Sequence, residues 1–163
     1  MKIRVGFGYD VHRLVENREL WLGGIRIEHT KGLLGHSDAD VLIHAICDAL
    51  LGAANMRDIG YHFPDTSSEY ENIDSKVLLR KTVALIATRG YEIGNIDATI
   101  CAEQPKLNLH IPVMQKSLAS VMCIDPENVS IKATTTEKLG FTGRMEGISA
   151  YATVLISKQS LHG

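Results

Sequence analysis

Apolar and polar residues alternate along several stretches of the chain in the manner of β-strands. The pattern predicts strands over residues 2–9, 20–22, 25–27, 91–102, 129–133 and 148–157. The second and third of these flank Gly23 and Gly24, a pair typical of a tight turn. We therefore expect these two strands to form a hairpin.

Residues 38–54 instead have apolar side chains at every third or fourth position, which predicts an amphipathic helix. Asp40, His44 and Asp48 follow one another along one edge of it. Asp48 is thus a candidate to hold one ring nitrogen of His44. An ordinary pairing of surface residues one turn apart explains Asp48 equally well.

The helices have recognisable start and stop signals. The first can be capped by Ser37 or Asp38, and the second by Asp74 or Ser75, with Gly90 as its stop. A third helix is predicted over residues 110–122. Two stretches are interpreted as loops: the segment around Gly32 and Gly35, and residues 57–68. The second is long enough for a lid or binding loop, and a plain solvated connector explains it as well.

The interleaving of these elements predicts the fold class α+β. We expect a single mixed or antiparallel sheet with helices on one face, in one domain covering residues 1–163. Ile, Val and Ala remain to cover the other sheet face, which favours an oligomer packed sheet to sheet.

Composition excludes several functional classes. The 17 Lys and Arg are balanced by 19 Asp and Glu, so no global positive field favours nucleic acid or an anionic membrane. No apolar run reaches the roughly 20 residues that span a bilayer, and a signal peptide is not recognisable, so a soluble, cytoplasmic protein is expected. The three cysteines are expected to be reduced core thiols: Cys47, Cys101 and Cys123.

Asp10 and His12 are the first candidates for chemistry. Two positions apart on a strand, they point to the same side and can reach one ion together. His44, on the first helix, is the best candidate for a third ligand. One carboxylate and two imidazoles suit zinc, with a fourth position left open for a substrate oxygen.

The stretch from Thr134 to Glu137 offers hydroxyls and amides for phosphate oxygens and a carboxylate for a second cation. Strand propensity explains the threonines as well. The loop from Glu103 to Lys106 is a candidate for nucleotide recognition or a plain turn at Pro105.

Taken together, these motifs resemble the 2-C-methyl-D-erythritol 2,4-cyclodiphosphate synthase family over nearly the whole chain. The resemblance rests on six blocks: residues 8–12, 36–41, 58–60, 63–66, 103–106 and 132–144. It implies a homotrimer whose sheets face a threefold axis and whose active sites lie between neighbouring subunits.

The reaction implied by this resemblance is the metal-dependent cyclisation of 4-diphosphocytidyl-2-C-methyl-D-erythritol 2-phosphate. The 2-phosphate attacks the β-phosphate, 2-C-methyl-D-erythritol 2,4-cyclodiphosphate forms and CMP leaves. This is a phosphorus–oxygen lyase reaction of non-mevalonate isoprenoid biosynthesis. Phosphoryl transfer needs alignment and charge neutralisation more than a protein nucleophile.

The resemblance also implies roles for individual residues. Asp10, His12 and His44 match the zinc ligands, and Glu137 matches the carboxylate of a second ion, magnesium or manganese. His36 and Thr135 match the residues that stabilise the transition state.

The remaining matches concern substrate binding. Beside Asp10, His12, His36 and Ser37, the methylerythritol phosphate would contact Asp58, Ile59, Gly60, Phe63, Pro64, Asp65, Thr66 and Ser67. Ser67 departs from the Asp of many relatives, so one hydrogen bond of this loop is in question. The cytidine would contact Ala102, Glu103, Gln104, Pro105, Lys106, Leu107, Asn108, Thr134, Thr135 and Thr136 of the adjacent subunit. In some members, the positions of Phe141 and Arg144 face an axial cavity able to hold a prenyl diphosphate.

Two other functions are compatible with the same residues. A metal-dependent phosphohydrolase would use the ion to activate water and release a linear phosphate. A noncatalytic trimer would sense prenyl diphosphates through Arg144.

Overall fold

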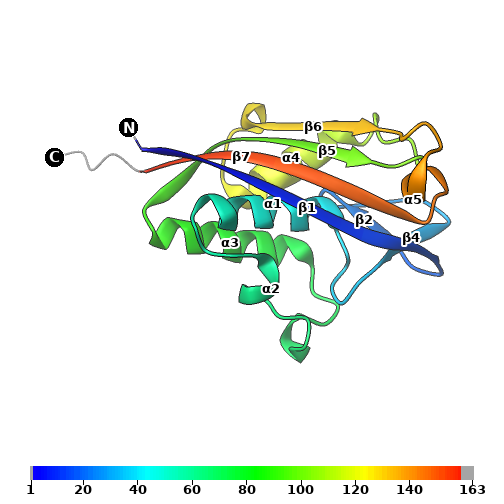
Figure 1. Ribbon diagram of the computed structural model, residues 1–163, viewed down its shortest axis with the longest axis horizontal. Helices are drawn as coiled ribbons and strands as arrows, with labels where there is room; N and C mark the ends of the chain where they lie inside the picture. The colour runs from blue at the N-terminus through cyan, green and yellow to red at the C-terminus, as the bar shows by residue number, and fades with distance from the viewer. Residues whose placement is uncertain (1, 159–163) are drawn as a thin grey trace.

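The computed structural model describes residues 2–158 and is built around a mixed five-stranded sheet in the order β4-β1-β7-β5-β6 (Figure 1). Strands β5 and β6 run parallel and every other neighbouring pair is antiparallel. The mixed sheet agrees with the sequence prediction. The strands are β1 (Ile3–Glu16), β4 (Lys31–Leu34), β5 (Tyr91–Cys101), β6 (Val129–Thr134) and β7 (Gly147–Lys158).

Helices α1 and α4 pack on one face of this sheet, and α3 packs against both (Figure 1). The predicted hairpin is present as β2 (Leu20–Leu22) and β3 (Ile25–Ile27). None of the described helices is long and apolar enough to cross a membrane. The helices are α1 (Val41–Ala53), α2 (Ile59–His62), α3 (Ser75–Thr88), α4 (Ile111–Met122) and α5 (Gly140–Gly143), with 3-10 turns η1 (Ser68–Tyr70) and η2 (Pro126–Asn128).

Two strands differ from the sequence prediction. β1 continues to Glu16, well beyond Tyr9, and β4 forms where a loop was predicted. The loop was predicted because of Gly32, which lies within β4. A Cβ atom on Gly32 would lie 2.1 Å from the carbonyl oxygen of Glu19. This glycine marks a close approach between backbones within a strand, which glycine allows, and does not mark a loop.

The start of α1 also differs from the prediction, because its N-cap is Asp40 and not Ser37 or Asp38. Ala39 has a φ of 59°, which no helical residue adopts, so the helix cannot extend back past it. Ser37 and Asp38 do accept backbone hydrogen bonds two residues ahead, but these close local turns before the helix begins.

Asp40 joins the hairpin to the start of α1. Its fully buried carboxylate accepts hydrogen bonds from the N–H groups of Ile43, Gly23 and Gly24 at 3.1, 3.0 and 2.7 Å. Burial, together with the charge of Asp38, raises the pKa of this carboxyl. The three amides satisfy a charge that would otherwise be costly to bury.

Helix α1 lies unusually close to β1 because two glycines on the strand leave no side chain between them. A Cβ atom on Gly6 would stand 1.9 Å from the carbonyl oxygen of Ala49, and Gly8 is confined in the same way. Ten residues of α1 are buried between the sheet and α3. The close contact brings His44, on the same helix, level with Asp10 and His12.

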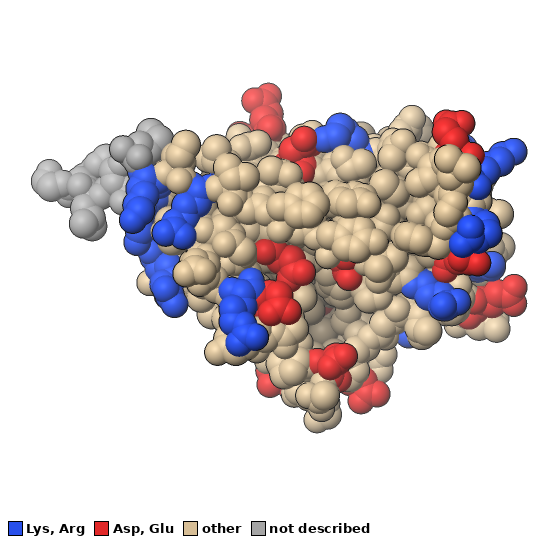
Figure 2. Space-filling view, in the orientation of Figure 1, with Lys and Arg blue, Asp and Glu red and all other residues tan. Residues whose placement is uncertain are grey.

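The opposite face of the sheet carries exposed apolar side chains. Figure 2 shows this face as a broad region over β1 and β7 with few Lys, Arg, Asp or Glu side chains. The rings of Tyr9 and Tyr151 lie 5.0 Å apart on it. Its large members, between 40% and 66% exposed, are Ile3, Val5, Phe7, Tyr9, Val11 and Tyr151.

Candidate active site

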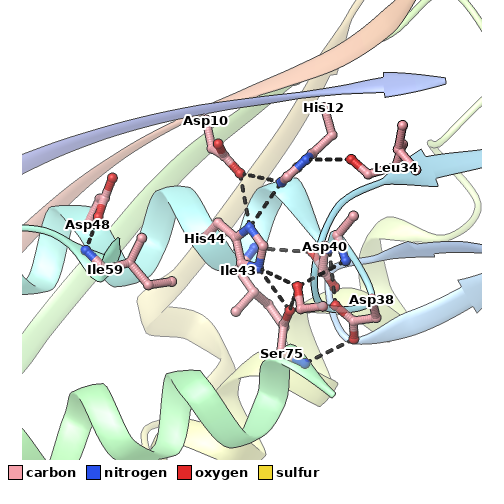
Figure 3. A network of polar contacts seen from close by, with 12 residues as sticks. Asp10, His12, Leu34, Asp38, Asp40, Ile43, His44, Asp48, Ile59 and Ser75 are labelled. Carbon is pink, nitrogen blue, oxygen red and sulfur yellow. Dashed lines mark hydrogen bonds and ion pairs between the residues drawn. The ribbon is translucent and has the colours of Figure 1, made fainter. Parts of the chain in front are cut away.

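The three predicted metal ligands converge on one point (Figure 3). Asp10 Oδ2 lies 2.9 Å from His12 Nε2 and 3.0 Å from His44 Nδ1, and the two nitrogens are 3.1 Å apart. Asp10 and His12 come from β1 and His44 from α1, far apart in sequence. The close packing of α1 on β1 brings them together.

This donor set fits a zinc ion. One carboxylate oxygen and two imidazole nitrogens form a common zinc site, and zinc bonds of about 2.0–2.1 Å separate tetrahedral ligands by about 3.3 Å. The triangle formed by Asp10, His12 and His44 is slightly smaller, so a small outward movement would accommodate the ion. The side chains are 12–26% exposed, which leaves one side of the site accessible.

The charges of the site favour a cation. Burial alone would raise the pKa of Asp10, but hydrogen bonds from His12 and His44 outweigh it and lower this pKa to about 2. Burial likewise lowers the pKa of His12, but the hydrogen bond and charge of Asp10 prevail and raise it. The carboxylate of Asp10 is therefore ionised, and its negative charge attracts a cation.

The ring of His12 is held in the tautomer that a metal ligand needs. Its Nδ1 lies 2.9 Å from the carbonyl oxygen of Leu34, which can only accept a hydrogen bond. In the neutral ring, Nδ1 therefore carries the only proton and the Nε2 lone pair is available to an ion; in the protonated ring, Nε2–H donates to Asp10 instead. Leu34 belongs to β4, so this contact depends on a strand that the sequence pattern did not reveal.

The predicted contact between Asp48 and His44 is wrong. Asp48 accepts a hydrogen bond from the N–H of Ile59 at 2.7 Å, whereas His44 Nε2 lies 3.0 Å from Ser75 Oγ and 3.2 Å from Ser37 Oγ. Helical side chains lean toward the helix N-terminus, so the far nitrogen of His44 points away from Asp48. Ser75 was recognised in the sequence only as a possible helix cap.

A cavity of about 370 Å³ opens beside these ligands. It brings together several residues predicted to bind the substrate, and Gly35, Tyr70 and Leu78, which were not predicted, join them. Its lining is His12, Gly35, His36, Ser37, His44, Ile59, Gly60, Phe63, Asp65, Tyr70 and Leu78.

Residues 35–37, which form the loop around His36, make hydrogen bonds with two other segments of the chain. His36 Nε2 lies 3.1 Å from the carbonyl oxygen of Ser67. Arg18 donates hydrogen bonds to the carbonyl oxygens of Gly35 and Ser37 at 3.1 and 2.6 Å. Arg18 was not predicted, because nothing in its sequence context distinguishes it from other surface arginines.

The other predicted residues of the sugar phosphate loop flank the cavity without lining it: Asp58, Pro64, Thr66 and Ser67. Asp58 is the N-cap residue of α2, but its side chain makes no capping hydrogen bond. Ser67 Oγ accepts a hydrogen bond from the N–H of Glu69, so it caps η1.

A second hollow, of about 170 Å³, lies at the ends of β5 and β6. It brings together most of the residues predicted for the cytidine. Those residues are Ala102, Pro105, Lys106, Leu107, Asn108, Thr134 and Thr135, with Ala133 added.

Glu103 connects this hollow to the loop that follows it. Its carboxylate accepts hydrogen bonds from the N–H groups of Thr136 and Lys138 at 3.0 and 3.2 Å. These hydrogen bonds lower the pKa of Glu103. The predicted second-ion residue, Glu137, lies between the two amides and is exposed, while Gln104 is exposed at the tip of its own loop.

The two hollows are separated within one chain. Val11 pairs with Ser149, Ser149 with Cys101, and Cys101 with Thr134, so Thr134 lies three strand spacings, about 14 Å, from β1. Thr134 is also exposed on the apolar outer face, whereas His12 points toward the helices. Within one chain, the two hollows therefore do not meet.

Phe141 and Arg144 line neither the 370 Å³ cavity nor the 170 Å³ hollow. Phe141 lines a third hollow, of about 230 Å³, which adjoins the candidate metal ligands because His12 also lines it; the other lining residues are Val11, Arg13, Glu146 and Gly147. Arg144 forms an ion pair with Glu146 at 3.2 Å, which neutralises its charge locally. A role for Arg144 in binding prenyl diphosphates stays a prediction.

The cysteines only partly follow the prediction. Cys47 is buried, and burial raises the pKa of its thiol to about 12, so it is an inert core residue. Cys101 is half-buried and Cys123 is exposed, so the prediction of a core position is wrong for Cys123. Cys123 occupies the left-handed residue that ends α4, with a φ of 56°, and the chain turns away from the core there.

Comparison with known proteins gives the same family. Residues 3–157 match the YgbB family. The chain is 80% identical over 158 residues to the 2-C-methyl-D-erythritol 2,4-cyclodiphosphate synthase of Bacteroides thetaiotaomicron, a match that covers 97% of this chain and 99% of that protein.

Solved structures agree in fold. The bifunctional IspDF from Campylobacter jejuni has a TM-score of 0.93 and 43% identity, over 96% of this chain and 42% of that longer one. The IspF from Plasmodium falciparum in complex with CDP has a TM-score of 0.85 and 35% identity, over 97% of both chains. The chain therefore belongs to the YgbB family and is an enzyme related to the 2-C-methyl-D-erythritol 2,4-cyclodiphosphate synthases, as its sequence motifs predicted.

Proposed function

We propose that this enzyme cyclises 4-diphosphocytidyl-2-C-methyl-D-erythritol 2-phosphate to 2-C-methyl-D-erythritol 2,4-cyclodiphosphate and releases CMP. The observation that carries the proposal is the meeting of Asp10, His12 and His44 at one point beside the 370 Å³ cavity. The name of the relative from Bacteroides thetaiotaomicron and the CDP bound to the Plasmodium falciparum protein support the same substrate class.

Asp10, His12 and His44 would hold a zinc ion, whose charge, when bound, polarises a phosphate oxygen and offsets the repulsion between two phosphates. His36 and Ser37 line the adjoining cavity and would orient the 2-phosphate for attack. The chain needs no nucleophilic side chain, because the attacking group is itself an anion. Breaking the bond between the β- and α-phosphates gives CMP.

We further propose that a complete active site forms only between neighbouring subunits of a homotrimer. Within one chain, Thr134 lies about 14 Å from β1 and points to the other face of the sheet. The chain would thus carry two half-sites that do not meet: a metal half-site (Asp10, His12 and His44) and a threonine half-site (Thr134–Glu137). The exposed apolar side chains of β1 and β7 supply a surface for sheet-to-sheet packing. In such an assembly, Thr135 and Glu137 of one subunit would act on the diphosphate held by the metal ligands of the next.

The reaction is tested by phosphorus NMR of purified protein with the diphosphocytidyl substrate, zinc and magnesium. We expect CMP and a cyclic diphosphate, and loss of both products in His44→Ala. A linear phosphate in place of the ring would identify a phosphohydrolase. Absence of any turnover with both metals present would refute the proposal.

The assembly is tested by sedimentation. We expect a species of three chains, each of 17.9 kDa. A stable monomer at micromolar concentration would refute the shared site.

A further inference from the structure

The far side of His44 is enclosed by two hydroxyl groups. Its Nδ1 faces Asp10 and His12, and its Nε2 lies 3.0 Å from Ser75 Oγ (Figure 3). The same Nε2 lies 3.2 Å from Ser37 Oγ. Ser75 is fully buried and Ser37 is only 6% exposed. A ring nitrogen in this position has to satisfy its hydrogen bond within the protein.

Ser75 is itself fixed by a carboxylate. Its hydroxyl donates to Asp38 Oδ1, and its backbone N–H donates to Asp38 Oδ2 at 2.9 Å. Because the hydroxyl proton is committed to Asp38, the oxygen of Ser75 presents lone pairs to His44. In the neutral ring, which is the form that binds a metal, His44 must then carry its proton on Nε2, which leaves the Nδ1 lone pair facing Asp10 and His12.

Ser37 is the weaker partner of the two. Its hydroxyl oxygen already accepts a hydrogen bond from the N–H of Ala39 at 3.1 Å, and it lies farther from His44. It is also 3.5 Å from Ser75 Oγ. Ser75 is therefore the residue that connects His44 to a charge.

We propose that Ser75 and Asp38 are positioning residues for His44. Asp38 orients the hydroxyl of Ser75, and Ser75 fixes the ring angle and the tautomer of His44, so that Nδ1 is ready to bind a divalent cation. The inference rests on the proposed metal site. Helix α3 packs on α1, and its first residue, Ser75, would thus also help to hold the ion.

Ser75→Ala and Asp38→Asn test this role. Removing a partner that orients a metal-binding histidine typically weakens metal affinity about 10- to 100-fold. We expect a loss of that size for Ser75→Ala, measured as zinc affinity by competition with a chelator. The absorption spectrum of the cobalt-substituted protein should change as well, because the ring angle of His44 alters the ligand field. Asp38→Asn should lower zinc affinity in the same direction.

Thr82→Val is the matched control. Thr82 is fully buried and lies seven residues after Ser75, on the same side of α3, so the change removes a buried hydroxyl from the same helix without affecting His44. It should keep wild-type zinc affinity and the wild-type cobalt spectrum. Thermal unfolding with chelator present measures stability separately from metal binding, and Ser75→Thr, which retains a hydroxyl, should recover part of the lost affinity.

Zinc binding by the wild type, His44→Ala and Ser75→Ala separates an error in the metal site from an error in the role of Ser75. If wild-type protein and His44→Ala bind zinc equally weakly, the metal site itself is wrong. If wild-type protein binds zinc tightly and folded Ser75→Ala binds it equally well with an unchanged cobalt spectrum, the metal site stands and the role of Ser75 is refuted.

Discussion

The carbonyl oxygen of Ala45 occupies the place where a side chain on Gly8 would have to be: a Cβ atom added to Gly8 would stand 1.9 Å from it. The obstacle is backbone, which cannot rotate away as the end of a long side chain can. Ala45 follows His44 on α1, and Gly8 lies two residues before Asp10 on β1. The contact therefore sets the spacing between the two elements that carry Asp10, His12 and His44.

Gly8→Ala should separate His44 from Asp10. Overpacking of this kind costs about 1–3 kcal/mol of unfolding free energy. A displacement of about 1 Å at the site should lower kcat about a hundredfold. Urea unfolding and zinc affinity measure the two effects, and both should fall together.

Gly52→Ala is the matched control for this change. Gly52 lies on α1, and an added Cβ would meet no described atom within 4 Å. Alanine there should raise the unfolding free energy by about 0.5–1 kcal/mol, because it favours the helix. Wild-type zinc affinity in Gly8→Ala would show that the close packing does not position the ligands.

The sequence was sufficient to predict that these three candidate ligands converge, because their geometry is local on each element. Period two in the strand places Asp10 and His12 on one side, and helical spacing places His44 among apolar residues. What holds these ligands could not be predicted. Leu34 comes from a strand hidden by its glycine, and Ser75 comes from a helix whose distance from His44 in space no local pattern encodes.

The same distinction explains why Asp48, a candidate partner of His44, does not contact its ring. Spacing by four residues places it near His44, but the direction in which side chains lean decides which atom each one reaches. Asp48 instead fixes Ile59 at the start of α2, and so positions one wall of the cavity. The sequence pattern identified neighbours on the helix but not their hydrogen bonds.

Glu103→Ala should weaken the use of the second ion without affecting zinc. Glu137 and Lys138 have φ values of 53° and 63°, which side-chain-bearing residues rarely adopt without support. Glu103 supplies that support by accepting hydrogen bonds from the amides on either side of Glu137. We expect the magnesium concentration for half-maximal activity to rise about tenfold.

Glu127→Ala provides the comparison for Glu103, since Glu127 is an exposed glutamate in η2, outside both half-sites. It should leave the magnesium dependence as in the wild type. Loss of zinc affinity in Glu103→Ala, or an unchanged response to magnesium, would contradict a role for Glu103 in supporting this loop.

Asp48→Asn should change how stability depends on pH in the metal-free protein. Burial, reinforced by the charges of Asp58 and Asp10, raises the pKa of Asp48 despite the hydrogen bond from Ile59. A raised pKa means that its contribution is fully favourable below the unfolded value of about 3.9 and is lost as pH rises through the folded value. An asparagine side chain cannot ionise, so the variant should gain stability over the wild type as pH rises from about 4 to 7. Urea unfolding across this range measures the difference, and a difference that stays constant would contradict the assignment.

Mixing two inactive variants should restore activity if each site is shared between chains. His44→Ala removes a ligand of the metal half-site, and Thr135→Val removes a hydroxyl of the threonine half-site. Each interface takes its metal half-site from one subunit and its threonine half-site from the next. In trimers refolded from equal amounts of the two variants, both half-sites are intact in roughly a quarter of the interfaces. Activity should therefore recover to roughly a quarter of the wild-type value, whereas each variant refolded alone stays inactive.

Recovery requires contact between chains, so mixing the folded variants without subunit exchange should give none. If refolded mixtures also stay inactive while forming trimers, both half-sites must act within one chain, and the separation of about 14 Å across the sheet would have to be closed by a movement of the Thr134 loop.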